Sequence, residues 1–191
     1  MRKNIIILCI GVLLISNFIF AGNTRSRLIA KYAQFQHSDP SFKEIHGTHE
    51  SYGGELSLGI STVVDLWFSG MYTSYNANPS TINAGPAISM IPIELGLKFK
   101  LPISIFTPYV GGGLVYTRYV DSTGETELNL DGLGYCGQMG LIFPSCTGKA
   151  CSSSLFVIDI FINYSVCRIN SDPFNFDTGG LRIGVGWGFS L

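Results

Sequence analysis

Beyond residue 25, apolar and polar side chains alternate along the chain with a period of two. That period is typical of a β-strand with one apolar face, whereas a helix repeats every 3.6 residues. In the last run, LRIGVGWGFSL, bulky apolar residues occupy every second position, and arginine, glycine and serine lie between them. The pattern therefore predicts an all-β chain. Eight runs are separated by segments rich in turn residues: 26–36, 51–60, 65–76, 88–99, 107–120, 130–143, 155–168 and 178–191.

The lengths of the runs and of their connections suggest a membrane barrel. Most runs have about ten residues or slightly more, which a tilted strand needs to cross a bilayer. Connections 61–64 and 100–106 are short, and 144–154 is long where a short one is expected. Short turns at one end and long loops at the other are typical of outer-membrane barrels. We predict an eight-stranded antiparallel up-and-down transmembrane β-barrel with both termini on the periplasmic side. The longer polar connections, which would contact any surface ligand, are 37–50, 77–87, 121–129 and 169–177.

Alternation also assigns the side chains to two faces. One face carries aliphatic and aromatic residues, and the other carries glycine and serine with few charges. A soluble sandwich or lipocalin-like barrel alternates in the same way, but its surface needs Lys and Glu. Only 13% of the residues are charged, about half the share in ordinary soluble domains. The apolar face is therefore expected to contact lipid. On the last run it comprises Ile183, Val185, Trp187, Phe189 and Leu191.

Two expectations concern individual strands. Pro92 cannot donate a ladder hydrogen bond, so it marks either a bulge or a strand that begins after it. Aromatic residues near strand ends are expected to form girdles at the membrane interfaces. The residues expected there are Tyr109, Tyr116, Phe143, Trp187 and Phe189.

Residues 1–21 have the pattern of a secretory signal peptide. Arg2 and Lys3 precede an apolar run that ends at Phe20, and the small residues Ala21 and Gly22 follow. Cleavage after Ala21 would leave a barrel domain of residues 22–191, and the alternative is an uncleaved anchor. The cleaved chain keeps ten basic residues against 13 acidic ones, a net charge near −3. Because it has no basic patch, no nucleic-acid partner is expected.

Three segments carry a family resemblance: YGGELSLGISTVVDLWFSGMY, TPYVGGGLVYTRY and GGLRIGVGWGFSL. They resemble the bacterial outer-membrane β-barrel domain family of small porin-like proteins of the OmpA/OmpX type. The resemblance covers most of the chain beyond the signal peptide. It implies an outer-membrane location, with membrane lipid as a partner, but no single activity. The aromatic-rich last strand also resembles the signal read by the barrel-insertion machinery, although it ends in Leu191 instead of the usual Phe.

Several charged residues fall on the inward face by alternation. Charges enclosed in a narrow barrel need partners, because an unpaired buried charge is strongly destabilising. We therefore predict an internal ion-pair network. Eight strands leave room only for side chains, which favours a filled interior over a gate or polar path. The predicted lumen charges are Glu55, Glu94, Lys98, Asp159 and Arg182.

The histidines offer only weak candidate chemistry. His37, His46 and His49 lie in or beside the first long connection. They could bind a metal if the loop curled, but the helical zinc-protease motif is absent, and a solvated loop is favoured. His37 with Ser38 and Asp39 permits a lipid-modifying enzyme without strongly supporting one. We expect no catalytic residue, metal or cofactor.

Four cysteines remain after removal of the signal peptide. Export brings them to an oxidising compartment. Cys146 and Cys151, within CTGKAC, are expected to form a short disulfide that would account for the long connection. Cys136 and Cys167 point inward on neighbouring strands. A simple hairpin register places Cys136 opposite a residue near 161, so these two thiols are expected to stay unpaired.

These features favour a structural or porin-like outer-membrane barrel with surface-exposed loops. The main alternative is an adhesin or ligand-binding barrel that acts through the loops. A soluble lipocalin-like carrier and a lipid-modifying barrel enzyme are less favoured.

Overall fold

The computed structural model describes residues 26–40, 47–75, 88–101, 103, 105–122, 127–144, 156–171 and 174–191. Every predicted strand is confirmed, with boundaries that shift by at most three residues. In the described part of the chain, no helix is long and apolar enough to cross a membrane. The strands are β1 (Arg27–His37), β2 (Thr48–Gly59), β3 (Val64–Tyr75), β4 (Ile88–Lys100), β5 (Thr107–Asp121), β6 (Leu128–Pro144), β7 (Phe156–Ser171), β8 (Phe174–Asp177) and β9 (Gly180–Ser190).

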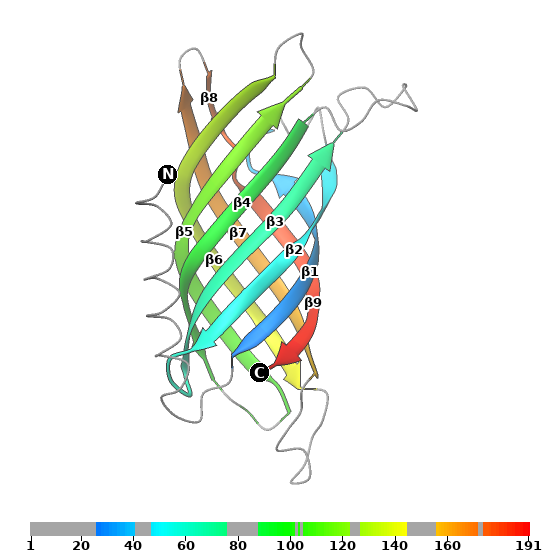
Figure 1. The fold of residues 1–191 in the computed structure, drawn as a ribbon, viewed down its shortest axis with the longest axis vertical. Coiled ribbons are helices and arrows are strands. Elements are labelled where there is room, and N and C mark those ends of the chain that lie inside the picture. The colour runs from blue at the N-terminus through cyan, green and yellow to red at the C-terminus, as the bar shows by residue number, and fades with distance from the viewer. Residues whose placement is uncertain are drawn as a thin grey trace, which may run out of the picture.

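Eight of these strands, β1–β7 and β9, form a closed antiparallel barrel (Figure 1). Consecutive strands pair from β1 to β7, and β9 closes the barrel between β7 and β1. At this seam Arg27 lies opposite Ser190, and the Leu191 backbone N–H donates to the Ser26 carbonyl at 2.8 Å. We call this end, which also has the turn at 60–63 and the start of β5, the lower rim. The β8 end is the upper rim.

The strands are staggered by a fixed amount. We start at Arg27 and step from each residue to the one directly paired with it on the next strand. After one turn around the barrel this path returns to β1 at His37, ten residues beyond Arg27. Strand number and stagger together set the tilt and the diameter, and eight strands leave an interior just wide enough for side chains. The path runs Arg27, Ser57, Trp67, Gly96, Gly113, Cys136, Ser165, Gly180, His37.

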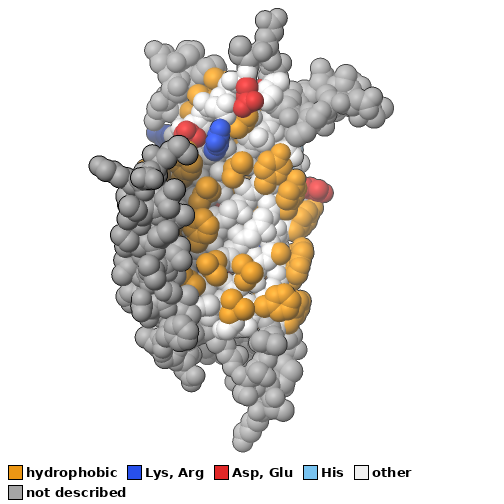
Figure 2. Space-filling model, in the orientation of Figure 1, with side chains coloured by type: hydrophobic (Ala, Val, Ile, Leu, Met, Phe, Trp, Pro, Cys, Tyr) orange, Lys and Arg blue, Asp and Glu red, His pale blue; other side chains and the backbone are white. Residues whose placement is uncertain are grey.

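The two faces follow the predicted alternation. Large apolar side chains are exposed on the outward face of every barrel strand. In the view of Figure 2, hydrophobic side chains lie on both sides of a white strip through the middle and lower part of the described surface, and the charged side chains lie in its upper half. The last strand places Ile183, Val185, Trp187, Phe189 and Leu191 outward, with exposures between 44% and 73%.

Pro92 lies inside β4. It stays opposite Thr117 of β5, while the ladder to β3 is interrupted between the pairs Gly70–Ile93 and Thr73–Met90. The register is the same on both sides of this gap. Both expectations for Pro92, a bulge and a strand that begins after it, are therefore wrong. The proline removes local hydrogen bonding to one neighbour without shifting the strand.

The last barrel strand is interrupted near the upper rim. β8 and β9 pair with β7 in one register, and the break falls at Thr178 and Gly179. The Asp177 carboxylate accepts hydrogen bonds from the backbone N–H groups of Cys167 and Gly179, at 2.9 and 2.7 Å. The Thr178 hydroxyl donates to the Cys167 carbonyl at 3.0 Å. Side chains thus satisfy backbone groups at the break, and the β7–β8 hairpin continues above β1.

The inward cysteines have a different register from the predicted one. Cys136 lies opposite Ser165, and Cys167 lies opposite Gly134. Both thiols are buried and free, so the prediction that they stay unpaired is confirmed, although the predicted partner near 161 is wrong. The expected Cys146–Cys151 disulfide and the expected signal peptide, 1–21, lie outside the described residues.

Candidate functional site

The middle of the barrel holds a cluster of four buried charges, Lys31, Glu55, Lys98 and Asp159. Lys31 donates to Glu55 Oε2 at 2.5 Å, and Lys98 donates to the other oxygen of the same carboxylate. The Lys31 ammonium also lies 3.8 Å from Asp159 Oδ2. Ser57 donates to Glu55 at 2.8 Å. Glu55 is thus the common partner of two lysines from different strands.

Tyr109 and Gln138 extend this cluster. The Tyr109 hydroxyl donates to Asp159 at 3.0 Å, and Gln138 donates to the Tyr109 oxygen at 2.8 Å. The Lys98 ammonium lies 4.6 Å from the centre of the Tyr109 ring, within range of a cation–π contact. The prediction that Tyr109 belongs to an interfacial girdle is therefore wrong, because this side chain points inward and is 5% exposed.

A second polar cluster lies nearer the upper rim, around Glu94 and Arg182. Their closest N–O distance is 3.5 Å. Asn163 and Ser69 each donate to Glu94 Oε2 at 3.0 Å. The Arg182 guanidinium also lies 4.5 Å from the centre of the Phe35 ring. Arg182, the single charge of the glycine-rich last strand, is therefore held by a carboxylate on one side and an aromatic ring on the other.

A third cluster lies near the lower rim. The Asp65 carboxylate accepts from Arg27 through one oxygen and forms an ion pair with Lys100 through the other. The Asp65 side chain is fully buried, and those of the two cations are about 10% exposed. This end of the lumen is therefore filled by an ion triad close to the rim.

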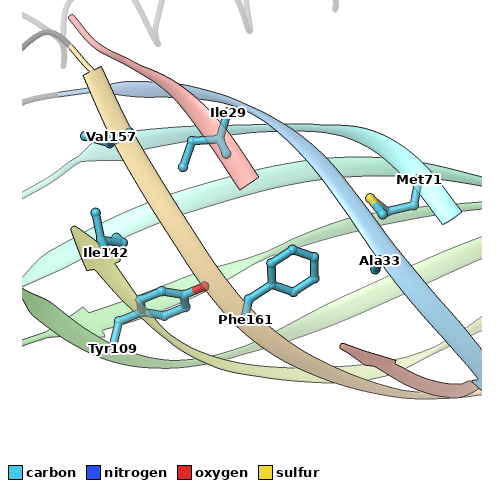
Figure 3. Close-up of a cluster of buried hydrophobic side chains, with 7 residues drawn as sticks. All are labelled: Ile29, Ala33, Met71, Tyr109, Ile142, Val157 and Phe161. Atoms are coloured by element: carbon cyan, nitrogen blue, oxygen red, sulfur yellow. The ribbon is translucent and has the colours of Figure 1, made fainter. Parts of the chain in front are cut away.

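Apolar side chains fill the space between and above the charges. Figure 3 shows the lower cluster, in which Tyr109 and Phe161 point into the lumen with Ile29, Met71 and their neighbours. A second apolar cluster, which we call the upper plug, consists of buried residues from five strands. The upper plug comprises Phe35, Ile88, Met90, Tyr119, Leu130 and Ile169.

Glycines make room for the largest inward side chain, Trp67, which is fully buried. A Cβ on Gly96 or Gly111 would lie 2.7 Å from its ring, closer than real Cβ atoms approach. The indole therefore occupies the space that side chains at these two positions would need. Small and large side chains thus occupy neighbouring inward positions here, as the interior of a narrow barrel requires.

A small cavity separates the middle and upper polar clusters. Its volume is about 10 Å³, close to the minimum that one water molecule requires. Lys31, Glu94, Gln138 and Arg182 are among its lining residues. Gln138 Oε1 and Arg182 Nε are buried without a hydrogen-bond partner. The cavity therefore suits a single bridging water and is too small for a larger solute.

The structure places all five predicted lumen charges, Glu55, Glu94, Lys98, Asp159 and Arg182, inside the barrel. It divides them between the middle and upper clusters. Four further charged members escaped the sequence analysis: Arg27, Lys31, Asp65 and Lys100. Lys31 lies on the same face of β1 as Ile29 and Ala33, so the alternation of the sequence already indicated that it points inward. Large residues on both faces of β1 and β3 made this indication hard to recognise.

The two described histidines, His37 and His49, lie on neighbouring strands near the upper rim. His37 ends β1 with 3% exposure and packs against the Phe35 ring at 4.7 Å between centroids. His49 lies within β2, so the solvated-loop interpretation is wrong for these two, while His46 lies outside the described residues. The Ser38 hydroxyl donates to Tyr164 at 3.2 Å. Among the described side chains, no group of three His, Cys, Asp or Glu residues could hold a metal.

Six tyrosines form a belt on the outward face. Tyr32 pairs with Tyr52, which pairs with Tyr72. The ten-residue stagger is divided equally among the eight strands to compare heights along the barrel axis. On this scale all six tyrosines lie at nearly the same height, above the middle of the barrel. Exposed Arg118, Asp131 and Arg168 lie above this level. The belt comprises Tyr32, Tyr52, Tyr72, Tyr116, Tyr135 and Tyr164.

Comparisons with known proteins identify the fold. No protein-family model matches the sequence, and no curated protein matches it. Neisserial surface protein A is similar in structure, with a TM-score of 0.62, 12% identity, and coverage of 87% of this chain and 97% of that one. The outer membrane protein OprG of Pseudomonas aeruginosa has a TM-score of 0.59, 12% identity, and coverage of 88% and 96%. The attachment invasion locus protein Ail of Yersinia pestis has a TM-score of 0.58, 14% identity, and coverage of 89% and 100%. The chain therefore has the fold of small eight-stranded outer-membrane barrels.

Proposed function

We propose that this protein is an outer-membrane barrel with a closed lumen, which anchors and presents loops at the cell surface. The filled interior carries this proposal. The lower ion triad, the two polar clusters and the upper plug occupy successive levels of the lumen. Many of their side chains have almost no exposure. A structural role is thus favoured over a porin-like role, since a conducting path would require charged clusters to separate.

The outward face supports the membrane location. Apolar side chains cover it from the lower rim to the tyrosine belt, and the exposed charges lie above that belt. An apolar band with interfacial aromatic residues is what a barrel presents to a bilayer. We place the lower rim in the periplasm and the upper rim at the cell surface, with export through a signal peptide cleaved after Ala21. The aromatic last strand is the segment for the insertion machinery to read.

The proposed surface contacts belong to the connections at the upper rim, 37–50, 77–87, 121–129 and 169–177. Much of this sequence lies outside the described residues. We propose no catalytic role, because the carboxylates that the structure describes in the three charge clusters are each engaged by a lysine or an arginine.

The first test is electrophoresis without boiling, followed by current recordings in planar bilayers. The folded barrel is expected to run at a different mobility from the boiled chain. It is also expected to show no steady conductance above that of the bare bilayer. A steady, ion-selective current through the folded protein would establish a porin-like role instead.

A second test measures membrane depth through the two tryptophans. Trp187 is 48% exposed on the outward face, whereas Trp67 is fully buried in the lumen. Brominated lipids quench tryptophans in contact with acyl chains, so quenching should persist in Trp67→Phe and largely disappear in Trp187→Phe. Equal quenching of both variants would contradict the assignment of the faces.

A further inference from the structure

The outward face has an apolar groove across β5, β6 and β7. Its volume is about 190 Å³, and its floor includes the backbone at Gly137. Val110, Met139, Ile162 and Tyr164 form its walls, and each is between 42% and 56% exposed. On a barrel embedded in a bilayer, such a groove is open only to lipid acyl chains or to another membrane protein.

The groove exists because Gly137 lacks a side chain. A Cβ at this position would have no atom nearer than 3.8 Å, the Gly111 carbonyl oxygen. The surrounding structure thus does not exclude a side chain here. Tyr164, directly opposite Gly137, borders the groove at its upper end. Its hydroxyl accepts from Ser38 at 3.2 Å, which places the ring tip at the upper rim.

An arginine lies directly beyond that tyrosine. Arg168 is on the same outward face of β7, two outward positions above Tyr164, and is exposed. Its cross-strand neighbours are Leu133 and Asp177. Asp177 accepts two backbone hydrogen bonds at the break in the last strand. Within the described residues, Arg168 forms no ion pair, so its guanidinium is available to a ligand.

The other charges near this level are already engaged. Arg118 donates to Asn129 at 3.2 Å, and Asn129 donates to Glu127 at 2.8 Å. Asp131 lies directly opposite Arg118 on the neighbouring strand. Arg168 therefore differs from Arg118 in having no polar side-chain partner in the described structure, which makes Arg118 a matched control.

We infer that this groove and Arg168 form a binding site for a lipid of the outer leaflet whose phosphate-bearing headgroup is anionic. One acyl chain lies over Gly137 between Met139 and Ile162, and Arg168 binds the phosphate at the level of the headgroups. The charge of Arg168 complements an anionic headgroup, and guanidinium groups bind phosphate through paired hydrogen bonds. The inference rests on the membrane location proposed above.

The test is native mass spectrometry of the refolded barrel in micelles, with phosphatidic acid or phosphatidylcholine added. The first molecule of phosphatidic acid is expected to bind about five-fold more tightly than the first molecule of phosphatidylcholine. This ratio corresponds to the roughly 1 kcal/mol that one arginine contributes near anionic lipid. Arg168→Gln should abolish this preference, whereas Arg118→Gln should keep it. Equal effects of the two substitutions, or no preference in the unmodified protein, would overturn the inference.

A second pair of variants tests the groove itself. Gly137→Leu fills the groove and should lower the affinity for the first bound molecule of either lipid several-fold. Gly70→Leu is its control, because Gly70 is outward on β3 and a Cβ there would meet nothing within 4 Å. The site is refuted if the two leucine variants bind lipid equally. It is also refuted if a second copy of the chain, and not lipid, is found bound at the groove.

Heat-modifiable mobility of every variant separates this inference from the proposed function. Failure of the unmodified chain to fold into bilayers would refute the membrane location, whereas a folded, inserted barrel without a preference for the anionic lipid would refute only the lipid site.

Discussion

Glu55 is the carboxylate on which two buried lysines depend, so Glu55→Gln is the most informative single substitution in the lumen. Glutamine keeps the shape of the side chain and its ability to hydrogen-bond, but it removes the negative charge. Lys31 would retain Asp159 at 3.8 Å. Among the described residues Lys98 forms a direct ion pair only with Glu55, so its ammonium would keep only a longer-range attraction to Asp159, which Lys31 already engages.

The size of the effect follows from the burial of Lys98. Its relative exposure is 0%, and that of Glu55 is 1%. Removing one partner of a buried ion pair typically costs about 3–5 kcal/mol, because the remaining charge is uncompensated. We expect Glu55→Gln to lower the free energy of unfolding by this amount. A buried pair replaced as a whole by apolar groups of similar volume is often neutral. Glu55→Gln combined with Lys98→Met should therefore recover at least half of the loss.

The assay is reversible denaturant unfolding of the refolded barrel in detergent micelles, in which the transition midpoint and slope give the free energy. Glu127→Gln is the matched control, because Glu127 is exposed and its side chain accepts a hydrogen bond from Asn129. Such surface changes usually stay within about 0.5 kcal/mol. A loss below about 1 kcal/mol for Glu55→Gln, or a double variant no more stable than the single one, would refute the reasoning about the ion cluster.

Two further predictions concern the packing of the lumen. Cys136 and Cys167 are buried, so a water-soluble maleimide should label them only after unfolding, and rapid labelling of either of these two residues in the folded barrel would contradict the closed interior. Gly111→Val should cost about 1–3 kcal/mol, because its Cβ would lie 2.7 Å from the Trp67 ring. Outward Gly112→Val should cost less, since its nearest contact is 3.8 Å, and equal losses in the same unfolding assay would count against this packing.

Alternation determined a large part of the fold. Side chains point to opposite faces of a strand in turn whatever the strand pairs with, so the pattern located all eight barrel strands. For the same reason it placed Glu55, Glu94, Lys98, Asp159 and Arg182 on the inward face. Where both faces carried large residues, as around Lys31 and Asp65, the local signal was ambiguous, and these two members of the charge clusters were missed.

Only the tertiary structure decided which inward residues meet. Contacts across the lumen depend on the closure of the barrel and on the ten-residue stagger, and no local segment encodes either quantity. The register of β6 and β7 placed Cys136 opposite Ser165, and neither strand by itself specifies which residue of its neighbour it meets. Closure likewise turned Tyr109 from an expected interfacial residue into a partner of Asp159. The sequence by itself thus determined which residues face inward, since sidedness is local geometry. The pairing of Glu55 with Lys31 and Lys98 came from the closed barrel, since that pairing is a property of all eight strands together.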